Sequence, residues 1–313
     1  MALDVYNLEF RSWCEEMTIA GYRFVRVAEY PEQLQGLHHR ITFHSEFGVK
    51  AATGGHRITA RVFPPETEDR AVLPWKDDRA TALEDVLMLL SIFTGRNVFV
   101  CRNEVMNAPV SVVVADPRDD LWGGVIRGSI PYERAPGPTK NDGVPHGDVG
   151  LETHLNQVYQ WMSTAEWRET YRDGHYLLLF RNALQQRSLE SAFPQCWTIW
   201  EHLFSVLNDR WMTKRTIENT NATEKIAFLL VRFGVRDRLQ DKEQSRLRSL
   251  AAIRNRLVHL GRFPESGTCF DDAVLFVYMT EWMVARTLNL LPSEALNTLE
   301  RFEAFIKNAS THS

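Results

Sequence analysis

The stretch Cys196-Trp-Thr-Ile-Trp-Glu-His-Leu-Phe204 decides how the second half of the chain folds. On an α-helix, its apolar side chains and Leu207 cover most of the circumference. Glu201 lies at one rim of this apolar arc, and its neighbour His202 lies at the opposite rim. Because so little of this helix is polar, we expect other helices to bury it.

From Leu151 onward, the spacing of apolar residues is typical of α-helices. Apolar spacing and helix-forming residues predict seven helices. Their ranges are Glu152–Met162, Ala165–Leu184, Phe193–Trp211, Thr223–Phe233, Lys242–Leu260, Phe270–Leu290 and Ser293–Lys307. Gly174 is a weak point in the second of them. The second half is therefore predicted to be an all-α helical bundle.

The first half of the chain has a different pattern, with short runs of β-branched and aromatic residues between turn-forming residues. These predicted strands are Tyr22–Val27, Ile41–His44, His56–Phe63, Asn97–Cys101 and Val110–Val114. One helix, Ala82–Phe93, lies among them and is stopped by Gly95. We therefore expect an amino-terminal α+β domain with a small sheet.

The predicted boundary between the two halves is the segment 131–150, which contains four prolines and four glycines. Such a segment cannot continue a helix or a central strand. The predicted organisation is an α+β domain over residues 1–130, a linker over 131–150 and a helical domain over 151–313. Substrate selection or regulation is the role expected of the first domain.

The whole chain has the composition of an ordinary globular protein. Its 313 residues carry a formal net charge of −4, and 44% of them are hydrophobic. This balance excludes whole-chain disorder. It also excludes a protein that coats nucleic acid with a wholly cationic surface.

The expected compartment is the cytoplasm. The first residues lack the basic and apolar regions of a secretory signal, and no apolar run reaches the roughly 18–20 residues of a membrane-spanning helix. The cysteines are isolated and form no C-x-x-C pair, which is typical of buried free thiols in a reducing compartment. We therefore expect no membrane association, no bound metal and no cofactor.

Positive charge is concentrated in the helical half. Residues 210–262 hold 13 Lys and Arg against 5 Asp and Glu, an excess that can attract phosphates. A solvated helix face explains the same excess equally well. The tryptophans of this half are expected in the core and not as base-stacking platforms. They are Trp161, Trp167, Trp197, Trp200, Trp211 and Trp282.

The segment with recognisable chemistry is Leu250-Ala-Ala-Ile-Arg-Asn-Arg-Leu-Val-His-Leu-Gly-Arg262. Arg254 is predicted to fall in the middle of an apolar arc, where it needs a carboxylate, a phosphate or a subunit interface. The members of that arc are Leu247, Leu250, Ala251, Leu257 and Val258. Asn255 and His259 lie one turn apart at its margin, and Gly261 is expected to end the helix.

A cation beside an imidazole suits ribonucleolytic transesterification. A base takes the proton of the ribose 2′-OH, a cation stabilises the charged phosphorane, and an acid protonates the departing 5′ oxygen. Arg254, Asn255 and His259 could carry out this reaction without a metal. The structural alternative is an arginine satisfied by Glu201 or by another carboxylate.

The run Arg254-Asn-Arg-Leu-Val-His259 resembles the R-N-x-x-x-H signature of the HEPN superfamily (higher eukaryotes and prokaryotes nucleotide-binding). The upstream run Cys196–Phe204 resembles the first core helix of Apea-like HEPN domains, which typically reads W-x-x-x-E-x-L-F. The order of the helices also matches, and the resemblance covers roughly residues 152–313. It implies an all-α bundle that dimerises so that two motifs face each other across a groove.

The resemblance also implies a function, because active HEPN domains are metal-independent endoribonucleases in toxins, abortive-infection systems and CRISPR effectors. It implies that Arg254 binds the scissile phosphate, that His259 transfers protons and that Asn255 orients one of them. We expect Glu201 to hold Arg254 or His259 in position. The further cations expected to contact RNA are Arg248, Arg256 and Arg262.

The expected partners are RNA and a second copy of the chain, with an antitoxin or an activating ligand as a further possibility. The expected biological role, from the resemblance alone, is that of a toxin or a phage-defence nuclease. The alternative is a catalytically inactive HEPN module that dimerises or binds nucleotide or RNA.

Overall fold

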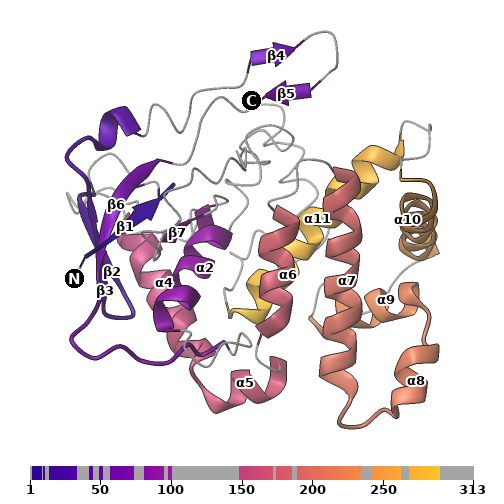
Figure 1. Ribbon diagram of the computed structural model, residues 1–313. Coiled ribbons are helices and arrows are strands. Elements are labelled where there is room, and N and C mark those ends of the chain that lie inside the picture. The colour runs from indigo at the N-terminus through magenta and orange to yellow at the C-terminus, as the bar shows by residue number, and fades with distance from the viewer. Residues whose placement is uncertain are drawn as a thin grey trace, which may run out of the picture. The chain divides into compact units, whose positions relative to one another are not determined.

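The computed structural model describes residues 2–8, 10, 14–33, 42–44, 49–51, 57–73, 81–94, 98–100, 148–171, 174–184, 189–233, 241–261 and 268–289. These residues belong to two compact units. A sheet unit contains the described residues up to 100 together with 148–160, and a helical unit contains those from 161 onward. Figure 1 shows the helices and strands of both units.

The sheet unit is built on five antiparallel strands in the order β2-β3-β6-β1-β7. Their bounds are β1 Leu3–Tyr6, β2 Glu16–Ile19, β3 Tyr22–Arg26, β6 Ile58–Phe63 and β7 Phe99–Val100. A separate hairpin pairs β4 (Thr42–His44) with β5 (Val49–Ala51). The β2–β3 turn has positive φ at both Ala20 and Gly21, which matches the right-handed twist of a two-residue hairpin.

Two helices, α2 (Ala82–Thr94) and α4 (Asp148–Met162), lie on one face of this sheet (Figure 1). Asn156 of α4 accepts a hydrogen bond from the Ala20 backbone N–H at 2.8 Å and donates one to the Thr18 carbonyl at 2.8 Å. Residues 148–160 of α4 therefore pack as part of the sheet unit, whereas the sequence places the domain boundary at 131–150.

The helical unit is organised around α7 (Leu189–Asn208). The other helices are α5 Ala165–Tyr171, α6 His175–Leu184, α8 Lys214–Asn219, α9 Ala222–Arg232, α10 Asp241–Leu260 and α11 Thr268–Thr287. Helix α7 packs against α6, α9, α10 and α11. Its apolar side chains are buried around most of the helix, as its sequence predicts; they are Phe193, Cys196, Trp197, Ile199, Trp200, Leu203, Phe204 and Leu207.

The predicted fold class is confirmed, because an α+β part with a small sheet precedes a largely helical part. The predicted helix 165–184 is broken at Gly174, whose φ is +66°. The strands β1, β2 and β5 were not predicted because each holds at most two β-branched or aromatic residues, and α8 was not predicted because it has only six residues. The predictions for Val110–Val114, for Ser293–Lys307 and for most of the linker lie outside the described residues.

Thr287, the last residue of α11, joins three other segments of the helical unit. Its carbonyl accepts hydrogen bonds from the indole N–H groups of Trp161 at 3.2 Å and Trp167 at 3.1 Å. Its hydroxyl donates to the Val284 carbonyl and is 2.6 Å from the hydroxyl of Tyr176. Burial raises the pKa of the Tyr176 phenol well above its ordinary range.

Replacing Thr287 by valine keeps the shape of this side chain but removes its hydroxyl. Tyr176 then has a buried hydroxyl without its partner, so we expect the free energy of unfolding to fall by about 1–3 kcal/mol. Urea denaturation followed by circular dichroism measures this change. The double variant Tyr176→Phe/Thr287→Val should be more stable than Thr287→Val alone, and the opposite order would contradict the assigned hydrogen bond.

No helix within the described part of the chain is long and apolar enough to cross a lipid bilayer.

Candidate functional site

Helix α10 buries one stripe of side chains against α7, α9 and α11. The stripe consists of Leu247, Leu250, Ile253 and Leu257, each at most 5% exposed. Val258, which the sequence places in the buried arc, is 55% exposed, so that prediction is wrong. The buried face is rotated toward Ile253, and Arg254 consequently lies half-buried at its margin and not in its middle.

A second half-buried arginine on α10, Arg246, was not singled out from the sequence. Its Nε and Nη2 both lie 3.0 Å from Oδ1 of Asp272 on α11. The signal that could have identified it is the spacing 246, 250, 253 and 257, which places Arg246 on the stripe one turn before Leu250. Arg246 is half-buried, with 39% of its side chain exposed, and it has a carboxylate partner of the kind that was expected for Arg254.

Arg254 differs from Arg246 because no carboxylate within the described residues pairs with it. Its Nη1 donates a hydrogen bond to Oδ1 of Asn255 at 3.2 Å, on the exposed side of the helix. Asn255 and His259 are exposed and lie one turn apart on one face. The structure thus leaves a guanidinium, an amide and an imidazole accessible to a ligand at the end of α10.

The position of His259 is fixed by the way α10 ends. Gly261 has a φ of +67°, and its N–H donates to the Leu257 carbonyl at 2.9 Å, which closes the helix. His259 therefore lies in the last turn, as predicted.

Arg254 and His259 do not share one face of α10. Five residues separate them, which corresponds to about 140° around an α-helix. Asn255 lies between them, because it contacts Arg254 and is one turn from His259. The motif therefore presents a broad band of polar groups and not a compact cluster within one chain.

Glu201, the predicted positioning residue, is half-buried on α7. Its Oε1 accepts a hydrogen bond from the indole N–H of Trp197, one turn earlier on the same helix, at 3.0 Å. The described interactions include no ion pair between Glu201 and either Arg254 or His259. The assignment of Glu201 as a positioning residue stays a prediction.

Two of the three further cations expected to contact RNA are exposed on α10. Arg248 lies seven residues, or about two turns, before Asn255 and shares its face. Arg256 is exposed on the adjoining face. Arg262 lies outside the described residues. The accessible side of α10 is therefore cationic along several turns, and such a surface attracts phosphates.

The described side chains contain no cluster of three or more His, Cys, Asp or Glu residues that could hold a metal ion. The two cysteines whose side chains are described, Cys14 and Cys196, are free thiols, and Cys196 is buried in α7. The groups available at the end of α10 are therefore Arg, Asn and His side chains, which can bind an anion and transfer protons.

Comparison with known proteins finds no match: no family model, curated protein or solved structure is significantly similar to this chain. The resemblance to HEPN domains therefore rests on the residues quoted from the sequence.

Proposed function

We propose that the protein is a metal-independent endoribonuclease of the HEPN type, with its active site at the end of α10. The proposal rests on the exposure of the Arg254 side chain and on its interactions. Its guanidinium is accessible, hydrogen-bonded to Asn255 and, among the described residues, not neutralised by a carboxylate. An RNA phosphate is a suitable partner for such a guanidinium, because it is negatively charged and two of its oxygens can accept two parallel hydrogen bonds from the arginine.

In the proposed reaction, the ribose 2′ oxygen attacks the adjacent phosphorus and the bond from phosphorus to the 5′ oxygen breaks. His259 takes the 2′-OH proton as a base or protonates the departing 5′ oxygen as an acid. Arg254 stabilises the negative charge that develops on the phosphorane. The products are a 2′,3′-cyclic phosphate and a 5′-hydroxyl.

Two copies of the chain form the proposed site. Arg254 and His259 lie about 140° apart on one helix, so a single chain does not readily place both on one phosphate. A second motif that faces the first across a two-fold axis supplies the missing group. Val258 and Leu260 are both more than half exposed at the same helix end, and they provide apolar surface for such a contact.

The substrate that fits this chemistry is single-stranded or looped RNA. In-line attack by the 2′ oxygen requires a backbone that is free of A-form geometry. By resemblance, the biological role is that of a toxin or a phage-defence nuclease.

The test is incubation of the purified full chain with an end-labelled single-stranded RNA in EDTA. We expect cleavage, with products that carry a 2′,3′-cyclic phosphate, and no cleavage of the same strand made with 2′-O-methyl riboses. Products that end in a 3′-hydroxyl, or a requirement for divalent metal, would contradict the proposal. RNA binding without any cleavage would favour the catalytically inactive module.

A further inference from the structure

The helical unit has an exposed aromatic surface that does not include the buried residues of α10. Trp211, just after α7, is 60% exposed, so its predicted place in the core is wrong. Its ring lies 6.3 Å from the ring of Phe228 on α9, at an interplanar angle of 38°. Val231, three residues further along α9, is 43% exposed. We call Trp211, Phe228 and Val231 the Trp211 patch.

The backbone beneath Trp211 is held in place. The N–H groups of Trp211 and Met212 both donate to the carbonyl of Asn208, at 3.1 and 2.8 Å. The Asn208 side chain is buried and donates to the Phe204 carbonyl at 2.6 Å. Because Phe228 also packs edge-on against Phe204, with ring centroids 5.5 Å apart, the indole rests on a fixed support. An aromatic group fixed in this way loses little entropy when a ligand stacks on it.

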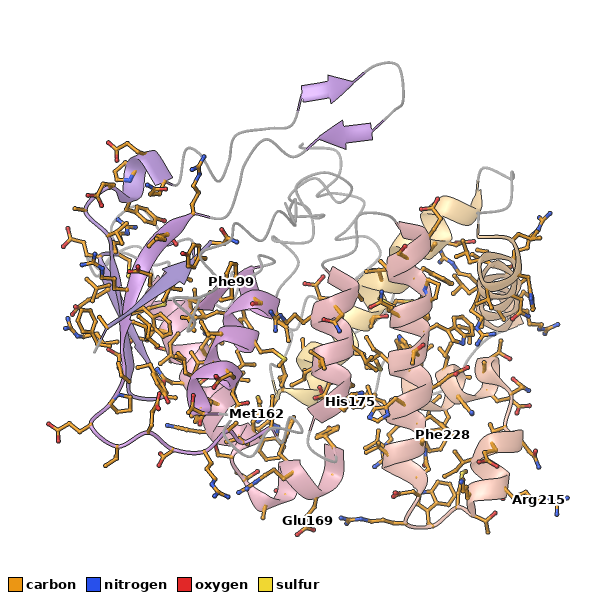
Figure 2. The ribbon with its side chains drawn as sticks, viewed as in Figure 1. Phe99, Met162, Glu169, His175, Arg215 and Phe228 are labelled. Atoms are coloured by element: carbon orange, nitrogen blue, oxygen red, sulfur yellow. The ribbon has the colours of Figure 1, made fainter. Side chains whose placement is uncertain are left out.

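The two helices that follow Trp211 in the chain, α8 and α9, each carry an exposed arginine. Arg215 on α8 is exposed and points away from its helix, and Phe228 is on neighbouring α9 (Figure 2). Arg232 is exposed beside Val231. Neither arginine has an ion pair within the described part of the chain.

The two other cations near Trp211 are in exposed ion pairs. Arg210 lies 3.4 Å from Glu169, and Lys214 lies 3.8 Å from Glu218. Exposed pairs of this kind contribute little free energy, so a phosphate can replace the carboxylate at small cost. The patch therefore combines an open ring with several cations that are available to a phosphate backbone.

We propose that the Trp211 patch binds single-stranded RNA, with one base stacked on Trp211 and flanking phosphates on Arg215 and Arg232. Stacking on an exposed ring beside cations is how proteins bind single strands with little sequence preference. Tryptophan and arginine are also enriched at protein interfaces, so the oligomeric state of the Trp211 variant is measured as well. A duplex is disfavoured because its bases are already stacked.

The patch is suited to hold the substrate of the proposed nuclease, and in this respect the inference rests on the proposed function. Helix α9 carries Phe228, Val231 and Arg232, and it packs directly against α10, which carries Arg254 and His259. RNA bound on α9 is therefore held on a helix next to the proposed site. Binding at the patch is measured independently of cleavage.

The experiment is fluorescence anisotropy of a labelled 12-nucleotide oligouridylate with 2′-O-methyl riboses, which cannot be cleaved by 2′-OH attack. We expect Trp211→Ala in the full chain to weaken binding by about 5- to 150-fold, the measured range for loss of one base–aromatic stack. Trp211→Phe should retain most of the affinity. Arg215→Glu and Arg232→Glu should each weaken binding and reduce its dependence on salt.

The matched control is Phe63→Ala in the sheet unit. Phe63 is also a partly exposed aromatic residue, with the Arg23 guanidinium 4.6 Å from its ring centroid, and its loss should leave binding unchanged. Circular dichroism and thermal unfolding confirm that each variant is folded.

Binding by Trp211→Ala within twofold of the wild type would overturn the inference. A change in oligomeric state in that variant, measured by light scattering, would also overturn it, because the patch would then be a protein interface. If the wild type binds RNA through Trp211 but never cleaves it, the proposed function fails and the inference stands. If the wild type cleaves RNA and Trp211→Ala binds normally, only the inference fails.

Discussion

Arg254→Ala is expected to lower the rate of RNA cleavage by about 10²–10³-fold, the usual loss when one group that stabilises transition-state charge is removed. The fold should hardly change, because the side chain is half-exposed and its only described hydrogen bond is to the adjacent Asn255. We expect the free energy of unfolding to change by no more than about 0.5 kcal/mol. Single-turnover cleavage and urea denaturation measure the two quantities on one preparation.

Arg246→Ala is the matched control on the same helix. In contrast to Arg254→Ala, it is expected to lower stability and to leave the cleavage rate unchanged. Arg246 pairs with Asp272 between α10 and α11, so we expect a loss of stability of about 1 kcal/mol. The folded variant should cleave RNA at a rate near that of the wild type. A rate loss in Arg246→Ala equal to that in Arg254→Ala would mean that both arginines support only the structure.

His259→Ala is expected to reduce the cleavage rate by about 10²–10⁴-fold, the contribution typical of a positioned acid or base. Its side chain is exposed in the last turn of α10, so the substitution should leave stability unchanged. Added imidazole should restore part of the rate, because a small base can occupy the space left by the side chain. A structural histidine would not respond in this way.

His175→Ala is the control for His259→Ala. His175 is also exposed, and it contacts the ring of His202 between α6 and α7, with centroids 5.7 Å apart (Figure 2). We expect full cleavage activity from this variant. Wild-type activity in His259→Ala, or equal loss in both histidine variants, would remove His259 from the proposed mechanism.

Much of the fold follows from local periodicity in the sequence. The apolar circumference of the 196–207 stretch predicts the buried centre of α7, and Gly261 predicts the end of α10. The strands β1, β2 and β5 were missed because each holds at most two β-branched or aromatic residues. Their place in the sheet depends on pairing with distant strands, for example Val5 with Ala60.

The candidate site was less predictable than the fold. A helical wheel identifies an apolar arc on α10, but a rotation of one residue moves Val258 to the surface and Ile253 to the core. That rotation depends on how α7, α9 and α11 pack against α10, which the sequence of α10 alone does not contain. The exposure of Trp211 was not predicted either, because it also depends on how the helices pack. A tryptophan after an apolar helix is usually buried.

The most direct test of the proposed site compares the wild type with the double variant Arg254→Ala/His259→Ala on one single-stranded RNA in EDTA. If the two residues act as a unit, the double variant should be about as slow as the slower single variant, because their effects are not additive. We expect the wild type to release 2′,3′-cyclic phosphate ends and the double variant to release almost none. Cleavage by the double variant at the wild-type rate would contradict the assignment of this helix end as the active site.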